Sequence, residues 1–175
     1  MADVIFQKQS APGAVPKSPP DPVSDRQLFD IIELLFFAYR DFVSDPDAIL
    51  DEFGFGRAHH RVLHFVKNHP GMPVADLLEI LKITKQSLGR VLRQLVETGY
   101  IEQRPGEVDR RQRLLYATEA GIALADRLSA PQMARIRLAL ETLGADRREV
   151  AVRFLQSMIN ERERAHVRRI LQTRD

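Results

Sequence analysis

Side chains that can read DNA share one face of a predicted helix near the middle of the chain. Thr84 is suited to cap this helix, Gly99 to end it, and the apolar residues between them recur at helical spacing. The candidate contacts are Thr84, Lys85, Gln86, Ser87, Arg90 and Arg93. Gln can pair with adenine, Arg with guanine and Lys with phosphate in a major groove. The pattern predicts a recognition helix, and a solvated charged face is the plainer alternative.

Two residues of this helix have a second reading. Ser87 could donate to a phosphate or serve only as part of the cap. Gly89 lies on the outward face, where it costs about 1 kcal/mol of helix propensity relative to Ala. Close approach to DNA would explain this glycine, and so would close packing against another helix.

A predicted hairpin carries a second basic cluster. Residues 100–104 and 113–117 have the pattern of short strands, and the connection between them contains Pro105 and Gly106. The candidate DNA contacts of this wing are Asp109, Arg110, Arg111 and Arg113. A carboxylate at position 109 could hold the Arg111 guanidinium extended through a charge-assisted hydrogen bond. Residues 56–117 contain eleven Lys or Arg and six Asp or Glu, a local charge of +5 that suits a polyanion-binding module, whereas the whole chain carries +2.

The remaining elements predict a mainly α fold with a small β-hairpin wing. We expect a disordered N-terminal arm over residues 1–23, which hold five of the ten prolines, and an N-terminal dimerisation helix and loop over 24–55. A winged helix-turn-helix DNA-binding domain should cover residues 56–117, with helices over 57–68 and from Pro73 to Leu81. C-terminal dimerisation helices should follow over residues 118–175.

The flanking helices carry their own signals. Ser24 and Gln27 form a capping box before a helix to about Val43, whose apolar residues cover too much of its surface for one neighbour. We therefore expect part of it to face a second chain. A loop with at most one short turn should follow over residues 44–56. Thr118 should cap the next helix and Pro131 should kink or break it. Asp146 and Glu149 should form another capping box, before a helix that continues to the end of the chain.

Histidines near residue 60 leave several functions open. Phe37, Tyr39, His59 and His60 are candidates to line a pocket for a small-molecule effector, because such pockets favour junctions between domains. His60 and His64 also have the spacing of a zinc pair, so a metal-responsive regulator using His59, His60 or His64 is an alternative. No glutamate lies between them where a hydrolytic base would be, which argues against a metal-dependent enzyme.

Several classes are disfavoured by composition. Without cysteine, the chain can form neither disulfides nor thiolate metal sites. The longest apolar run is too short to span a bilayer and no signal peptide is evident, so we expect a cytoplasmic protein without a membrane partner. No phosphate loop or nucleophile motif is present, so we expect no enzyme activity and no cofactor. A winged-helix module that binds proteins is a further alternative, but its surface should expose apolar anchors, which the outward face of the helix lacks.

The order of elements resembles the MarR family of bacterial transcription regulators. Residues 95–104 (LVETGYIEQR) are similar to the end of that family's recognition helix and first wing strand. Asp109-Arg110-Arg111 and residues 115–121 (LYATEAG) are similar to its wing signature, with Ala117 where Leu is usual. The chain also resembles the branch that regulates photosynthetic electron transport in alphaproteobacteria. The resemblance implies a homodimer that binds a pseudo-palindromic operator in double-stranded DNA, with Arg111 in the minor groove.

Overall fold

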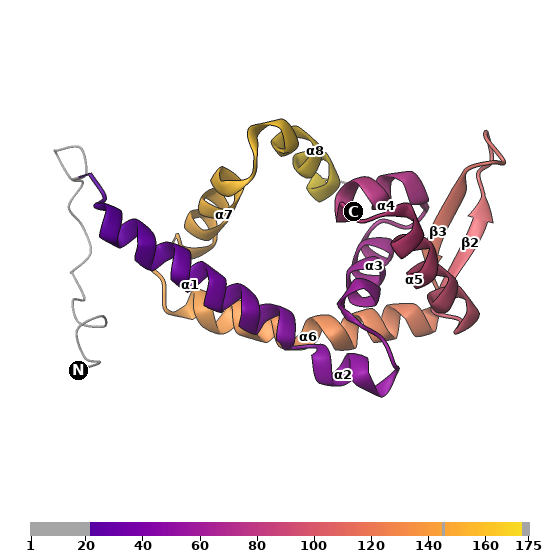
Figure 1. Ribbon diagram of the computed structural model, residues 1–175, viewed down its shortest axis with the longest axis horizontal. Helices are drawn as coiled ribbons and strands as arrows, with labels where there is room; N and C mark the ends of the chain where they lie inside the picture. The colour runs from indigo at the N-terminus through magenta and orange to yellow at the C-terminus, as the bar shows by residue number, and fades with distance from the viewer. Residues whose placement is uncertain (1–21, 145, 173–175) are drawn as a thin grey trace. The chain divides into compact units, whose positions relative to one another are not determined.

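The computed structural model describes residues 22–144 and 146–172 (Figure 1). The predicted arm over residues 1–23 therefore lies outside the described residues, apart from its last two positions. The chain divides inside helix α1 (Asp25–Ser44) into one unit that ends at Phe37 and another that begins at Ala38. The predicted capping box of α1 is confirmed, because the Ser24 backbone N–H and the Gln27 side chain are 2.9 Å apart and Gln27 N–H donates back to Ser24 Oγ.

Three helices form the helix-turn-helix region: α3 (Arg57–Asn68), α4 (Val74–Leu81) and α5 (Lys85–Glu97). The bounds of α3 are those that the sequence predicts. Thr84 caps α5 as expected, since its side-chain oxygen accepts from the Ser87 N–H at 3.1 Å. Pro73 is the N-cap residue of α4 and lies just before its first turn. The turn between α4 and α5 is tight, and it holds Lys82 at a φ of +50°.

The wing belongs to a three-stranded antiparallel sheet with the order β1-β3-β2. Strands β2 (Ile101–Pro105) and β3 (Arg113–Ala117) are the predicted hairpin. Gly99 follows the end of α5 and has a φ of +78°. Pro105 pairs with Arg113 at the end of β2 and does not lie in the connection. Strand β1 (Met72–Pro73) was not predicted, because two residues give no alternation to detect.

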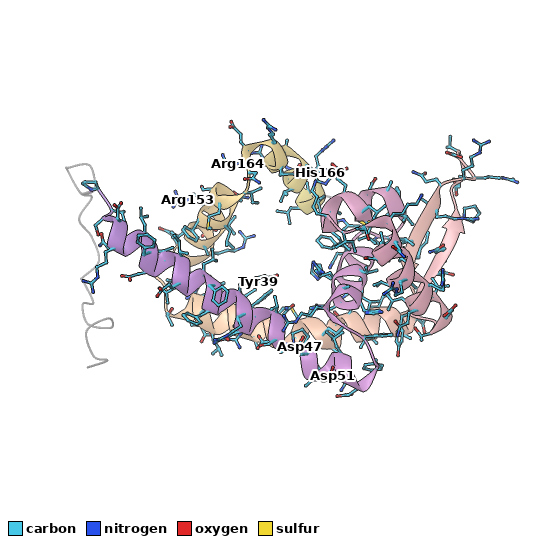
Figure 2. The ribbon with its side chains drawn as sticks, in the orientation of Figure 1. Tyr39, Asp47, Asp51, Arg153, Arg164 and His166 are labelled. Atoms are coloured by element: carbon cyan, nitrogen blue, oxygen red, sulfur yellow. The ribbon has the colours of Figure 1, made fainter. Side chains whose placement is uncertain are left out.

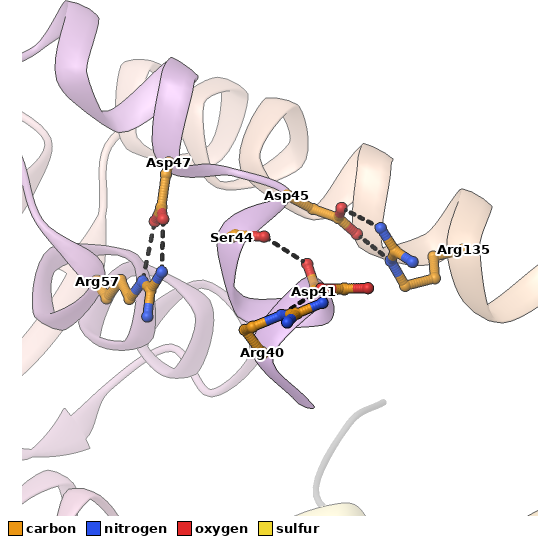
Figure 3. Close-up of polar contacts among 7 residues, drawn as sticks. All are labelled: Arg40, Asp41, Ser44, Asp45, Asp47, Arg57 and Arg135. Atoms are coloured by element: carbon orange, nitrogen blue, oxygen red, sulfur yellow. Dashed lines mark hydrogen bonds and ion pairs between the residues drawn. The ribbon is translucent and has the colours of Figure 1, made fainter. Parts of the chain in front are cut away.

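The sequence predicts a kink or a break at Pro131, and helix α6 (Glu119–Glu141) runs through this residue, so the alternative of a break is wrong. A proline removes one backbone hydrogen bond, and side-chain contacts on both sides support the helix. Arg127 binds Glu52 through two hydrogen bonds before Pro131, and Arg135 binds Asp45 through two bonds of 2.6 Å after it (Figure 3). Thr118 caps α6 as expected, accepting from the Gly121 N–H.

Three further expectations need correction. The segment predicted as a loop over residues 44–56 contains helix α2 (Asp47–Glu52). The Asp146 side chain makes no capping hydrogen bond, and the last predicted helix is divided into α7 (Arg147–Met158) and α8 (Glu161–Gln172). Arg164, at the turn between these helices (Figure 2), donates to the backbone oxygens of Ser157 and Ile159. These bonds satisfy carbonyls at the end of α7, which favours a stop at that point.

The core lies between the helix-turn-helix, the sheet and the first half of α6. Fully buried aliphatic side chains come from each of these parts and include Val62, Leu63, Leu77, Leu95, Leu115 and Leu128. Gly121 lets α6 approach the start of β2, since a Cβ at this position would lie 2.0 Å from the Tyr100 backbone oxygen. The core therefore fixes α5 and the wing on one frame.

Candidate nucleic-acid interface

Helix α5 divides cleanly into a buried face and an exposed polar face. Its buried residues are Leu88, Val91, Leu92 and Leu95, with Leu88 and Leu95 at 1% and 0% exposure, whereas Val96 is 38% exposed. Every predicted recognition residue on the helix is exposed: Lys85, Gln86, Ser87, Arg90 and Arg93. The N-cap residue Thr84 is exposed as well, although its oxygen is engaged by Ser87. The face that carries the donors is therefore free of intramolecular packing.

Gly89 is also exposed, and its surroundings separate the two explanations for it. A Cβ at this position would meet no atom of the described chain within 4 Å. Close packing against another helix of the same chain therefore does not account for the glycine. No contact within the described residues requires a glycine at this position.

The tip of the wing is organised by Asp109 in a way that differs from the expectation. Its carboxylate accepts from the Arg111 backbone N–H at 2.9 Å, and its backbone oxygen accepts from the Gln112 N–H at 3.0 Å. The Gly106 N–H closes the turn by donating to the Gln112 backbone oxygen. Asp109 thus shapes the backbone at the tip, and the prediction that it holds the Arg111 guanidinium is wrong. The short side chain of Asp commonly bonds the backbone two residues further on.

A groove of about 780 Å³ joins α5 to the wing. Lys85, Gly89 and Arg93 line it from the helix, and Arg111 and Arg113 line it from the wing. Glu97 is the one acidic residue among these lining residues. The structure thus brings four of the predicted cationic contacts to one concave surface. Gln86, Ser87, Arg90 and Arg110 are exposed outside this groove.

Two polar residues of the groove were not predicted. Gln103 and Gln112 also line it, from β2 and from the wing connection. The sequence offered little to distinguish them, because a single Gln in a strand or turn is usually only solvated. Arg104, by contrast, is engaged on β2, where its guanidinium lies 4.3 Å from the Tyr116 ring centroid and pairs with Glu102.

Two of the four residues that the sequence predicts for an effector pocket line one cavity. A cavity of about 310 Å³ is lined by the end of α1, by α3 and by α6, and Tyr39 and His60 are among its residues. His60 is 8% exposed, and its Nε2 has no hydrogen-bond partner within the described residues. Burial lowers the pKa of His60, and the nearby Asp47 carboxylate opposes this shift. His60 is therefore neutral near pH 7.

His59 and Phe37 are not among the lining residues of this cavity. The His59 ring stacks on Phe55 at 4.7 Å and lies 2.9 Å from Gln94 Oε1, so the prediction that it lines the pocket is wrong. Phe37 ends the other unit and is 47% exposed. At the cavity, Arg57 is held by Asp47 through bonds of 3.0 and 2.6 Å (Figure 3). Those bonds hold the pKa of Asp47 below its ordinary value.

The described residues contain neither a metal-binding cluster nor a helix that could span a membrane. Within residues 22–144 and 146–172, no group of three or more His, Asp or Glu side chains could hold a metal ion. The His60 and His64 rings are 6.5 Å apart and nearly perpendicular. The metal-responsive alternative thus gains no support from the described residues. Across the same ranges, no helix combines the length and apolar character that crossing a membrane requires.

Known proteins match both the sequence and the fold. A family model described as MarR family matches residues 53–112. The HTH-type transcriptional regulator PetP of Rhodobacter capsulatus is 44% identical over 144 residues, which cover 82% of this chain and 87% of PetP.

Solved structures extend the match to the fold. A MarR family regulator from Silicibacter pomeroyi aligns with a TM-score of 0.62 at 21% identity, over 71% of this chain and 84% of that one. A putative MarR family regulator from Listeria monocytogenes, crystallised with a 26mer DNA, aligns with a TM-score of 0.65 at 18% identity, over 77% and 89%. The chain therefore belongs to the MarR family of helix-turn-helix transcription regulators.

Proposed function

We propose that this regulator binds specific double-stranded DNA as a homodimer and that a small-molecule effector modulates the binding. The observation that carries the proposal is the groove in which Lys85 and Arg93 of α5 face Arg111 and Arg113 of the wing. The cations and glutamines among its lining residues suit a phosphate backbone beside base edges, and apolar side chains of α4 and α5, such as Leu78 and Val96, complete the lining. The Listeria regulator that was crystallised with DNA has the same fold, which supports this assignment.

The contacts divide by side-chain chemistry. Gln86 and Arg90 are assigned to base edges in the major groove, because both side chains can form two hydrogen bonds to one base. Lys85, Ser87 and Arg93 are assigned to phosphates, with Thr84 fixing the start of the helix. Arg111 is assigned to the minor groove, whose negative potential attracts arginine, and Arg110 and Arg113 are assigned to the flanking backbone.

The dimer is supported by apolar side chains that the described chain leaves exposed. They lie on three helices: Phe29, Ile32 and Phe36 on α1, Ile136 and Leu138 on α6, and Phe154 and Leu155 on α7. Exposed apolar area on this scale marks an interaction surface. In a homodimer, the two copies of α5 would read half-sites about one helical turn, or roughly 10 bp, apart.

Substitution of Arg111 tests the DNA-binding assignment. We expect Arg111→Ala to weaken binding at least tenfold in a gel-shift titration, using genomic fragments that the wild-type protein selects. The dimer should persist in size-exclusion chromatography with light scattering. Arg162→Ala on α8 is the matched control, because it removes an exposed arginine outside the groove and should change affinity less than about twofold. Equal binding by Arg111→Ala and the control would remove the wing from the interface.

Effector binding is assigned to the cavity lined by Tyr39 and His60. Its lining is largely apolar, and the free Nε2 of His60 could accept or donate one hydrogen bond. A thermal-shift screen of small organic compounds should find ligands that stabilise the wild-type protein. His60→Leu should abolish the shift while retaining the fold. Ligands that stabilise both proteins equally would place the effector elsewhere.

A further inference from the structure

His59 connects the start of α3 to the recognition helix. Its Nε2 lies 2.9 Å from the Oε1 atom of Gln94, which belongs to the last turns of α5 and is 35 positions further along the chain. Its Nδ1 lies 3.1 Å from the backbone nitrogen of Gly56, the N-cap residue of α3. The imidazole ring also stacks on Phe55, which is 5% exposed, at an angle of 6°. One half-buried side chain thus makes three contacts that join two segments, the start of α3 and the last turns of α5.

These contacts determine the tautomer of His59. The Gly56 backbone N–H can only donate, so Nδ1 must carry a lone pair and no proton. A neutral imidazole then has its proton on Nε2, which donates to Gln94 Oε1. A doubly protonated ring would set an N–H against the Gly56 N–H. The geometry therefore requires the neutral ring with the Nε2–H tautomer.

The hydrogen bond between His59 and Gln94 adds a directional restraint to the apolar contacts that hold α5 in the core. Burial of Leu88, Val91, Leu92 and Leu95 fixes which face of α5 points into the core, although the hydrophobic effect itself is not directional. A hydrogen bond is directional and weakens steeply when misaligned. Rotating a helix by about 20° moves side chains at its surface by roughly 2 Å, because its radius with side chains is about 5–6 Å. Such a shift would separate donors from base edges.

We propose that His59 is a positioning residue that sets the rotation of the recognition helix through Gln94 and so determines discrimination between DNA sequences. Gln94 is one helical turn after Arg90, which places the bond next to a residue assigned to base contact. The inference rests on the proposed DNA-binding function. Its effect should appear in the preference for selected over random DNA, since random DNA is bound through phosphates that tolerate small rotations.

A set of three variants tests the bond. Gln94→Ala removes the acceptor, and His59→Gln removes the bridge while keeping a capping-box acceptor for Gly56. Gln94→Glu is the rescue variant, because a carboxylate also accepts from Nε2–H. The affinity ratio between a wild-type-selected duplex and a random duplex of equal length is measured by fluorescence anisotropy. We expect the ratio to fall five- to tenfold in the first two variants, with random-DNA affinity within twofold, and to be retained in Gln94→Glu.

The tautomer gives a second measurement that does not depend on DNA. Imidazole ¹⁵N NMR of the full chain at pH 8, with His59 assigned by the loss of its signals in His59→Gln, should show a protonated Nε2 and an unprotonated Nδ1. An Nδ1–H tautomer, or an unchanged affinity ratio in both bridge-removing variants, would overturn the proposal. If the wild-type protein shows no preference for any duplex, the proposed function fails instead, so the two failures are distinguishable.

Discussion

The winged-helix region and the last helices of this chain use their apolar residues in opposite ways. Helices α3 and α5 each bury four side chains, whereas α7 and α8 bury none. Helix α6 shows both behaviours. Its buried residues end at Leu128, and beyond Pro131 its large apolar side chains, such as Ile136 and Leu138, are 48% and 65% exposed. The first region thus completes a core within one chain, and the second leaves large apolar side chains exposed in the described part of the chain.

The contacts of α8 agree with its lack of buried side chains, because they are polar and lie near the surface. Glu163 lies 3.3 Å from Lys82, the residue that follows α4, and His166 (Figure 2) lies 3.9 Å from Glu79 of α4, so polar contacts connect α8 to the end of α4. Ion pairs between exposed groups typically contribute less than about 1 kcal/mol. Burying one large apolar side chain contributes about 1.5–3 kcal/mol. The comparison teaches that α3 to α5 are fixed by burial, whereas α7 and α8 bury no side chain within the described residues.

The largest effect should come from the closest contact inside the core. Gly121→Ala would place Cβ 2.0 Å from the Tyr100 backbone oxygen, which cannot yield as a flexible side chain would. We expect a loss of at least about 3 kcal/mol in the free energy of unfolding, measured by urea denaturation followed by circular dichroism. Gly144→Ala, with no atom within 4 Å, should change it by less than about 0.5 kcal/mol. Equal stability of the two variants would contradict the tight packing of α6 against β2.

Substitution of an exposed apolar residue on α7 should weaken the dimer without unfolding the winged-helix region. Phe154→Glu puts a charge on the apolar surface of α7, where Phe154 is 48% exposed in the single chain. We expect the dimer dissociation constant to rise at least about a hundredfold, or roughly 2.7 kcal/mol. Analytical ultracentrifugation over a dilution series measures it. The adjacent Arg153→Ala should leave the constant unchanged, and a dimer equally stable in both variants would exclude this surface from the interface.

The bridge between Asp45 and Arg135 joins the end of α1 to the second half of α6. Its two bonds are 2.6 Å long, the Asp45 side chain is only 15% exposed, and the hydrogen bonds from Arg135 hold the pKa of Asp45 below its ordinary value. We expect Asp45→Asn to cost about 1–2 kcal/mol at pH 7. A lowered carboxyl pKa gives stability that is present above the ordinary value and is lost as the pH falls through the lowered one.

The pH dependence provides the check on this bridge. The difference between wild type and Asp45→Asn should shrink as the pH falls below about 4, in urea titrations at several pH values. Asp41→Asn is the control, because Asp41 is 43% exposed and its carboxylate pairs with the neighbouring Arg40. A difference that stays constant down to pH 2 would show that the charge of Asp45 contributes nothing.

The smallest effect is expected for a substitution at Gly89, which should raise the free energy of unfolding and lower the affinity for DNA. Gly89→Ala adds a methyl group in open space on α5, so we expect a gain of about 1 kcal/mol in unfolding free energy from helix propensity. If DNA approaches this face closely, the same methyl group should weaken binding severalfold. Thermal denaturation and gel-shift titration of one preparation measure both. A more stable variant with unchanged DNA affinity would place the duplex further from α5.

Much of the fold could be predicted because its signals are local. The caps at Thr84 and Thr118, the glycine at position 99 and the bounds of α3 depend on residues within one or two helical turns. Errors arose where distant contacts decide the local outcome. Helix α6 continues through Pro131 between two arginine bridges to residues more than 70 positions away, and the break before α8 is stabilised by bonds from Arg164. Neither the arginine bridges beside Pro131 nor the hydrogen bonds of Arg164 produce a periodic pattern in the sequence.

The candidate site likewise has features that local sequence signals predict and features that depend on contacts between distant residues. The sequence by itself determined that the face with Lys85, Gln86 and Arg90 is polar, because helical periodicity assigns the opposite face to the core. Only the tertiary structure decided that Arg93 shares a groove with Arg111 and that His59 turns to Gln94 instead of the effector cavity. The physical reason is the sequence separation between the residues that interact. Periodicity acts along one helix, whereas a groove or a bridge depends on how the core and the hairpin orient separate elements.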